Sequence, residues 1–307
     1  MKTIVDKISC EKVLIDPETV ILDIETTGLS RKNDLIITIG LLYGSDDEVV
    51  TEQYFAESLA DEVKLIEKFL DRIKSFETIL TYNGDSFDLP FIREKINFYS
   101  FADFNVTQID LYKIVRKYKD ILDLQRTNQK EVEKYLHIER RENLKGSDVA
   151  LLYKNFLLKG ASSEEIILHN KYDLINLHKI LKIEEVIADK MTVETDLGIF
   201  TIKDFNVNKN LLTLTGATSC KNIFYNRDNY EMQVRGNTFT LEIFLEEENY
   251  DTQSKCKFIN RNKLPEVKDY SQIEFPAALY PISLGRKIFT KNIVDLGKEI
   301  IKQEMKA

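Results

Sequence analysis

A short apolar segment that contains two acidic residues constrains this chain most. Val20–Gly28 reads VILDIETTG, and its β-branched residues followed by Thr-Thr-Gly predict a buried strand and a turn. Because successive strand residues point to opposite faces, Asp23 and Glu25 should project side by side from one face. Two buried carboxylates are costly without a cation, and the segment has no Lys or Arg. A divalent metal ion is therefore one candidate, and a solvated sheet face is the alternative.

The segments around this strand predict an α/β domain with a mixed sheet. Apolar runs of strand length and amphipathic patterns of helical spacing follow one another along the first 181 residues. The expected strands are 19–25, 35–43, 49–55, 78–82 and 107–111, the first three as an antiparallel meander. The first expected helix begins after Ser58 and ends near Ile73. The other expected helices cover 87–96, 111–122, 128–136, 147–159 and 163–181. This order of strands and helices is typical of a sheet flanked by helices.

The pattern changes at Met191. From there, short alternating runs are separated by Asn, Asp and Gly turns, which predicts a small β-rich domain. A helix from about Ile293 to Glu304 follows. We therefore expect two domains, 1–188 and 189–307.

Composition limits the classes of protein to which this chain can belong. With 43% hydrophobic and 31% charged residues, it has the composition of a globular protein. No apolar run reaches the ~18 residues of a membrane span, and the first residues lack the hydrophobic region of a signal peptide. We expect a cytoplasmic protein without a membrane partner. Cys10, Cys220 and Cys256 are far apart, which argues against a disulfide framework or a zinc site.

The net charge of −8 argues against a surface that coats nucleic acid generally. Binding of a polyanion by an acidic domain requires metal ions that supply positive charge locally. A modest basic stretch in the C-terminal part, Lys255, Lys257, Arg261 and Lys263 around Phe258, suits backbone phosphates. An ordinary solvated face explains the same stretch.

Two further acidic positions follow in the chain. Asp88 lies in the first turn of an expected helix, just beyond a strand end, where α/β sheets build their sites. A carboxylate that stabilises the helix dipole is the alternative. His169 and Asp173 lie four residues apart on a later helix and so share one face. A surface contact is the alternative for this pair.

The three elements together resemble a known family. Asp23-x-Glu25, Asn83-x-x-x-Phe87-Asp88 and His169-x-x-x-Asp173 occur in the order of the three motifs of the DEDD-type 3′→5′ exonucleases. The match is closest to the YprB-type branch, which is related to the proofreading domains of family B DNA polymerases. It covers about residues 18–185 and implies a ribonuclease-H-like fold, a mixed β-sheet flanked by helices, followed here by the small β-rich domain.

The resemblance implies the chemistry. Asp23, Glu25, Asp88 and Asp173 become the four carboxylates that bind two Mg²⁺ or Mn²⁺ ions, and the reaction becomes phosphodiester hydrolysis at 3′ ends of single-stranded DNA or RNA. His169 stands where one class of the family has Tyr, four residues before the last Asp, whereas the other class has His five residues before it. We expect His169 to orient or deprotonate the attacking water.

Substrate contacts are expected from five residues. Thr26 and Thr27 are candidates to contact the terminal nucleotide, and Leu29 is a candidate to pack against its base, although a plain strand-to-turn exit explains them equally well. Asn83 and Phe87 match the flanking positions of the second motif. Asp110, at the end of a short strand, is a candidate to support the site or to cap a helix.

Two other functions remain open from the sequence. One is a non-catalytic nucleic-acid-binding or scaffold protein that retains a ribonuclease-H-like fold, in which one or more of the four carboxylates is typically lost. Another is a different metal-dependent phosphohydrolase, which would release other products. DNA and RNA are not distinguished, because both present the same phosphodiester.

Overall fold

The computed structural model describes residues 1–306 except 46, 141 and 143. The chain forms two compact units, which are described separately. The N-terminal unit comprises Met1–Lys119 and Leu124–Ile183, and the C-terminal unit comprises Asp120–Asp123 and Glu184–Ala307. The boundary expected near residue 188 lies within helix α7 (Ile183–Met191) and stays a prediction.

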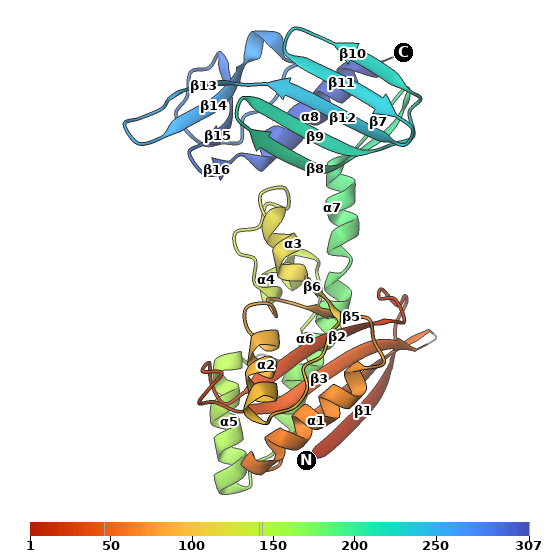
Figure 1. The fold of residues 1–307 in the computed structure, drawn as a ribbon, viewed down its shortest axis with the longest axis vertical. Coiled ribbons are helices and arrows are strands. Elements are labelled where there is room, and N and C mark those ends of the chain that lie inside the picture. Colours follow the sequence, from red (N-terminus) through yellow and green to blue (C-terminus); the bar gives the residue numbers. More distant parts are fainter. Residues whose placement is uncertain (46, 141, 143, 307) are drawn as a thin grey trace. The chain divides into compact units, whose positions relative to one another are not determined.

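A six-stranded mixed sheet forms the centre of the N-terminal unit (Figure 1). Its strands are β1 (Lys2–Ser9), β2 (Thr19–Thr26), β3 (Ile36–Ser45), β4 (Glu48–Phe55), β5 (Thr78–Thr81) and β6 (Thr107–Asp110). Their order is β1-β4-β3-β2-β5-β6. The pairs β1–β4, β4–β3 and β3–β2 are antiparallel, and the pairs β2–β5 and β5–β6 are parallel. The expected antiparallel meander is thus confirmed as β2, β3 and β4.

Strand β2 lies inside this sheet, between β3 and β5. Val20, Ile21 and Leu22 are buried, as the apolar run predicts. In the register with β3, Asp23 faces Gly40. Since β2, β5 and β6 run parallel, their carboxyl ends meet at one edge of the sheet, where α/β folds place their sites.

Helices pack on both faces of the sheet. Helix α1 (Glu62–Ile73) buries Leu65, Ile66 and Phe69 against β3 and β4, whereas α6 (Glu164–Ile180) covers β2, β3 and β4 from the other side (Figure 1). The remaining helices are α2 (Asp88–Phe98), α3 (Leu111–Lys117), α4 (Gln129–Tyr135) and α5 (Gly146–Lys159), with a short 3₁₀ turn at Leu59–Asp61. The α/β fold class expected from the sequence is therefore confirmed.

The structure differs from the expected elements at two places in this unit. Strand β1 was not expected, because Lys2–Ser9 mixes charged and apolar residues; it pairs only with β4, as an edge strand, where charged side chains remain solvated. The helix expected over 111–122 ends at Lys117. Asp123, which belongs to the C-terminal unit, has a left-handed backbone (φ 56°).

The C-terminal unit contains two antiparallel sheets, most of α7, a short 3₁₀ turn at Arg261–Lys263 and a C-terminal helix. The first sheet has the order β10-β11-β12-β9-β8-β7 and the second has the order β13-β14-β15-β16. Their bounds are β7 (Thr192–Thr195), β8 (Gly198–Asn208), β9 (Leu211–Thr218), β10 (Ile223–Asn226), β11 (Tyr230–Arg235), β12 (Thr238–Phe244), β13 (Glu246–Asn249), β14 (Lys255–Asn260), β15 (Leu279–Leu284) and β16 (Lys287–Ile288). Helix α8 (Thr290–Glu304) ends at Glu304, whose carboxylate accepts hydrogen bonds from Arg227 and Tyr230. The expected β-rich architecture is confirmed.

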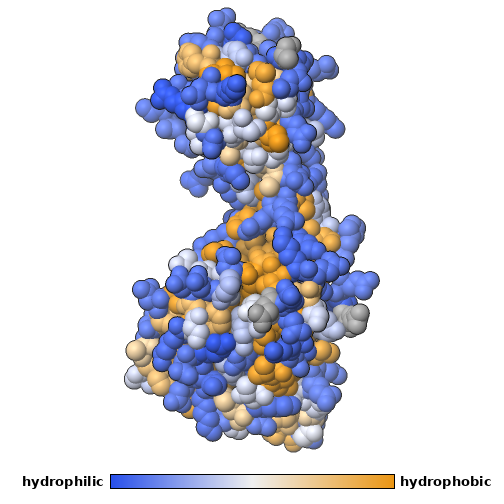
Figure 2. Space-filling view, turned by 90° about the vertical axis from the view of Figure 1, so that its right-hand side faces the viewer, coloured by the Kyte–Doolittle hydropathy of each residue, from blue (hydrophilic) through white to orange (hydrophobic). Residues whose placement is uncertain are grey.

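The surface agrees with the composition. Hydrophilic residues predominate on the face drawn in Figure 2, with apolar groups between them. Within the described residues, none of the helices has the length and apolar character needed to cross a bilayer. The three cysteines are free thiols.

Candidate active site

Asp23 and Glu25 lie on the face of β2 that helix α6 covers. The Nδ2 atom of Asn170 donates to Asp23 Oδ2 at 2.7 Å, and His169 Nε2 lies 3.8 Å from Glu25 Oε1. Glu25 is only 8% exposed, and Asp23 is half-buried. The strand alternation read from the sequence therefore directs both carboxylates into the interior of the unit.

Asp88 joins them from the neighbouring loop. It begins α2, and its Oδ1 accepts a hydrogen bond from the backbone N–H of Ile24 at 3.1 Å, between the two acidic residues of β2. Asp110 supports the preceding turn, because its Oδ1 accepts from the backbone N–H of Asn83 at 2.7 Å and of Tyr112 at 3.1 Å. Asp110 thus has both of the roles that the sequence suggested: it caps α3, and it supports the site by fixing the loop that leads to Asp88.

Helix α6 contributes His169 and Asp173 to the same place. His169 is 3% exposed, and its Nε2 lies 3.5 Å from Asp173 Oδ2, one turn along the helix. The other carboxylate oxygen of Asp173, Oδ1, accepts a hydrogen bond from Arg140. One atom each of Glu25, His169 and Asp173 lies within 4.8 Å of the others.

Burial, and then the proximity of other carboxylates, raises the pKa of Asp23, Glu25 and Asp88. Burial, and then the charges of Asp173, Glu25 and Asp88, raises the pKa of Asp23 well above its usual value. Burial and the charges of Asp173 and Asp88 do the same to the pKa of Glu25. Burial raises the pKa of Asp88 to about 7, although its hydrogen bond from Ile24 opposes the shift. The raised pKa values follow first from burial and second from neighbouring negative charges.

One arginine supplies positive charge nearby. Arg140 donates to Glu133 Oε2 at 2.8 Å and also binds Glu142 and Asp173, so that three carboxylates share one guanidinium group. In the described part of the chain, Asp23, Glu25 and Asp88 form no ion pair with Lys or Arg. Carboxylate oxygens grouped without a countercharge are the donor set that Mg²⁺ and Mn²⁺ prefer, so these residues fit a divalent ion.

Sequence reasoning missed a chain of polar groups behind Asp23. The Nε2 atom of Gln53 donates to Asn170 Oδ1 at 2.7 Å, and Asn170 in turn donates to Asp23. A Cβ atom at Gly40 would lie 2.1 Å from Asn170 Oδ1, so only glycine leaves room for this amide. The signal was present in the sequence, because Gly40 interrupts an apolar strand and such glycines mark close approaches.

Arg140, Glu133 and Glu142 were also missed. They come from α4 and from the segment between α4 and α5, which shows no regular pattern. Arg140 pairs with Asp173 and Glu142 lies beside His169, and each of these partners is about 30 residues away in the sequence. Nothing in the local sequence indicates such a contact.

The residues expected to contact substrate lie at the carboxyl edge of the sheet. Thr26 Oγ1 donates to Gly28 O at 2.7 Å, and Thr27 Oγ1 accepts from the N–H of Leu35 at 2.9 Å, so both hydroxyls stabilise the turn itself. Leu29, at the tip of this turn, is 84% exposed. The turn thus presents an apolar side chain to solvent.

The other two residues expected to contact substrate frame the loop before α2. Asn83 has a left-handed backbone (φ 65°), and Phe87 packs against Phe91 with ring centroids 5.6 Å apart. Substrate contact by all five of these residues stays a prediction.

The basic stretch of the C-terminal unit is largely neutralised. Lys255 and Lys257 both pair with Glu247, at 2.8 and 2.9 Å. Arg261 donates to Leu279 O at 3.1 Å. The side chain of Lys263 lies outside the described residues. These contacts favour the solvated-face interpretation over a phosphate-binding surface.

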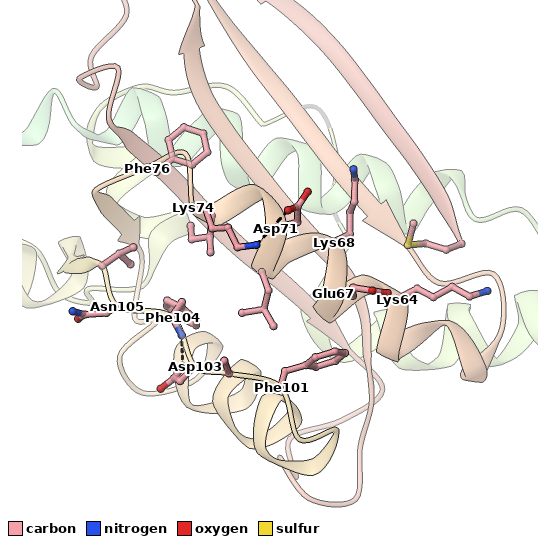
Figure 3. A pocket seen from close by; sticks show the side chains of 15 residues that line it. Lys64, Glu67, Lys68, Asp71, Lys74, Phe76, Phe101, Asp103, Phe104 and Asn105 are labelled. Carbon is pink, nitrogen blue, oxygen red and sulfur yellow. Dashed lines mark hydrogen bonds and ion pairs between the residues drawn. The ribbon is translucent and has the colours of Figure 1, made fainter.

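A cavity of about 1030 Å³ lies elsewhere in the N-terminal unit (Figure 3). It runs between α1 and the segment 101–106, and Phe76, Phe101 and Phe104 form part of its wall. Lys74 and Asp71 pair with each other at 3.4 Å on its rim. None of the four carboxylates lines it, so it is separate from the candidate active site.

The fold and the site define a class of protein. A mixed sheet whose central strand carries two acidic residues, with further carboxylates from flanking helices, is the arrangement of ribonuclease-H-like domains. A family model described as the RNase_H superfamily matches residues 20–184. The chain belongs to this superfamily, and the fold expected from the three motifs is confirmed. Among curated proteins, none matches the sequence significantly.

Several solved structures are distantly similar. A family B DNA polymerase from the hyperthermophilic archaeon Pyrobaculum calidifontis has 19% identity and a TM-score of 0.44, over 55% of this chain and 24% of the polymerase. NrnC of Brucella melitensis bound to pGG has 14% identity and a TM-score of 0.34, over 57% of this chain and 76% of NrnC. E. coli exonuclease I in complex with a dA16 oligonucleotide has 15% identity and a TM-score of 0.32, over 64% of this chain and 54% of the exonuclease. The chain thus spans about a quarter of the polymerase and half of exonuclease I.

We predict that Gly40→Ala disrupts the support of Asp23. The new methyl group would meet Asn170 Oδ1, so the amide must move and its hydrogen bonds to Asp23 and Gln53 weaken. We expect a loss of about 1–3 kcal/mol in the free energy of unfolding, measured with urea, and weaker Mn²⁺ binding by calorimetry. Gly146→Ala is the matched control, because a Cβ there meets no atom within 4 Å. Unchanged stability and Mn²⁺ affinity in Gly40→Ala would contradict this role of the glycine.

The raised pKa of Asp88 predicts a pH-dependent stability of the metal-free protein. The folded state holds the proton up to about pH 7, whereas the unfolded chain releases it near pH 4, so stability falls as the pH rises between these values. The difference of about three pKa units between the folded and unfolded states limits this fall in the free energy of unfolding to ~4 kcal/mol. Thermal melts from pH 4.5 to 8 with a chelator measure the fall, and Asp88→Asn should reduce it. An equally steep fall in Asp88→Asn would assign the effect to other groups.

Proposed function

We propose that this protein is a metal-dependent 3′→5′ exonuclease that hydrolyses phosphodiester bonds at the 3′ end of single-stranded DNA or RNA with two Mg²⁺ or Mn²⁺ ions. One observation supports this proposal above the others. Carboxylates from β2, α2 and α6 meet at a buried point, and three of them, Asp23, Glu25 and Asp88, form no ion pair with Lys or Arg among the described residues. A pair of cations would balance this charge.

Each carboxylate has a proposed role. Asp23 would be shared between the two ions, Glu25 and Asp173 would complete the first set of ligands, and Asp88 would hold the second ion. When bound, such a pair of ions lowers the pKa of a water molecule and relieves charge on the attacked phosphate. The protein groups orient these ligands: Asn170 holds one oxygen of Asp23, and the Ile24 N–H holds one oxygen of Asp88.

The direction of attack and the single-stranded substrate follow from the likeness of the three motifs to DEDD-type exonucleases. Leu29 is suited to contact the terminal base, because its side chain is fully apolar and 84% exposed beside the site-bearing edge of the sheet. All four carboxylates are present, which favours an enzyme over a non-catalytic relative that has lost one of them.

We predict that Asp23→Ala and Asp173→Ala abolish hydrolysis. Loss of a ligand removes several kcal/mol of transition-state stabilisation, about a thousandfold or more in rate. The assay uses 5′-labelled single-stranded DNA and RNA with Mg²⁺, Mn²⁺ or a chelator. We expect a ladder that shortens from the 3′ end and releases mononucleotides.

The controls separate loss of chemistry from loss of fold and from other activities. Asp71→Asn, an exposed carboxylate on α1, should retain activity, and circular dichroism checks that every variant folds. A circular substrate should resist the enzyme because it has no 3′ end. Metal-dependent hydrolysis that survives in Asp23→Ala and Asp173→Ala, or internal cuts in the circle, would refute the proposal.

A further inference from the structure

We propose that His169 Nε2 is itself a metal ligand, together with Glu25 and Asp173, and that this site therefore binds Mn²⁺ in preference to Mg²⁺. The inference rests on the proposed function and deepens it, because it assigns the histidine to the ion rather than to a proton of the attacking water. Three features of the described residues support it: the distances, the state of the imidazole and its place on α6.

The distances between the three side chains suit a shared ion. Ligand atoms about 2.1 Å from an octahedral ion lie about 3.0 Å apart when adjacent and about 4.2 Å apart when opposite. His169 Nε2 lies 3.5 Å from Asp173 Oδ2 and 3.8 Å from Glu25 Oε1, between these two values. Asp173 keeps Oδ2 available, since Arg140 binds its other oxygen.

One nitrogen of the buried His169 imidazole, Nδ1, completes no hydrogen bond of good geometry. The side chain is 3% exposed, and Nδ1 lies 3.1 Å from Glu142 Oε1. Buried polar atoms without partners are rare and costly. An ion on Nε2 would fix the tautomer that carries its proton on Nδ1, where the N–H faces Glu142 Oε1 at 3.1 Å. Such carboxylate–histidine–metal chains are common at metal sites.

The position of His169 on α6 directs it at the carboxylates. Residues four apart on a helix share one face, so His169 and Asp173 point to the same place. A spacing of five residues would turn the imidazole by about 100° relative to this position. The imidazole of His169 therefore lies among the carboxylate oxygens, where it can bind the ion directly. It does not lie to one side of them, where it would contact a water molecule instead.

A nitrogen ligand has a consequence for the choice of metal. Mg²⁺ prefers oxygen ligands and retains its water molecules, whereas first-row transition ions accept imidazole. An Asp and a Glu with one imidazole therefore favour Mn²⁺ over Mg²⁺. Carboxylates alone would discriminate much less between the two ions.

Pulsed electron paramagnetic resonance of the full chain loaded with Mn²⁺ tests the assignment directly, because nitrogen bound to Mn²⁺ modulates the echo. We expect the echo modulation that a directly bound imidazole nitrogen produces. When histidine is labelled with ¹⁵N, the frequencies of this modulation should change to those of ¹⁵N. This measurement needs no substitution, so it is decisive even where a variant fails to fold. A spectrum without histidine nitrogen coupling would overturn the proposal.

Two variants identify the histidine among the three in the chain. His169→Gln should lose the coupling and weaken Mn²⁺ binding by about 10- to 100-fold or more, because substitution of a residue that merely hydrogen-bonds a metal ligand already has an effect of that size. The effect on Mg²⁺ binding should be smaller. His137→Asn is the matched control, because His137 is exposed and its left-handed backbone (φ 55°) tolerates Asn. His178 Nε2 already accepts the N–H of Leu14 at 2.9 Å.

The outcomes distinguish this inference from the proposed function. Coupling that persists in His169→Gln would refute the ligand assignment. Hydrolysis that needs Asp23 and Asp173, with no histidine coupling to Mn²⁺, would refute it too, while the exonuclease proposal would stand. Absence of any Mn²⁺ or Mg²⁺ binding would refute both.

Discussion

The burial of negative charge beside strand β2 is the constraint on which the site depends. Asp23 and Glu25 point into the space under α6, and Asp88 and Asp173 add charge to the same place. Such a group of carboxylates destabilises a fold unless protons or cations compensate it, and the raised pKa of Asp88 shows the first form of compensation. The surrounding sheet must therefore supply enough apolar burial to tolerate this charge, and the fully buried Val20, Ile21 and Leu22 of the same strand contribute to it.

The neutral polar groups around this charge restrict its geometry. Gln53, on β4, holds Asn170, on α6, and Asn170 holds Asp23, so three elements fix one carboxylate through two hydrogen bonds. Asp110 similarly fixes the turn that leads to Asp88. Neutral amides suit the first task because they orient a carboxylate without neutralising it, which keeps its charge available for a cation.

Much of this arrangement could be predicted from the sequence, because its signals are local. Alternation along β2 directed Asp23 and Glu25 to one face, and helical spacing paired His169 with Asp173. Contacts that depend on tertiary structure could not be predicted. Arg140 reaches Asp173 from an irregular segment, and the importance of Gly40 depends on a helix 130 residues away. Strand β1 was missed because an edge strand needs no apolar face.

The contact of Arg140 with three carboxylates has a consequence for the structure around the site when no ion is bound. By bridging Glu133, Glu142 and Asp173, the guanidinium group ties α6 to the segment that follows α4 without any help from an inorganic ion. These contacts link α4, the segment after it and α6 beside the candidate site. Under the proposed function, removal and return of the ions would leave this link in place, so we expect ion exchange without unfolding of the site.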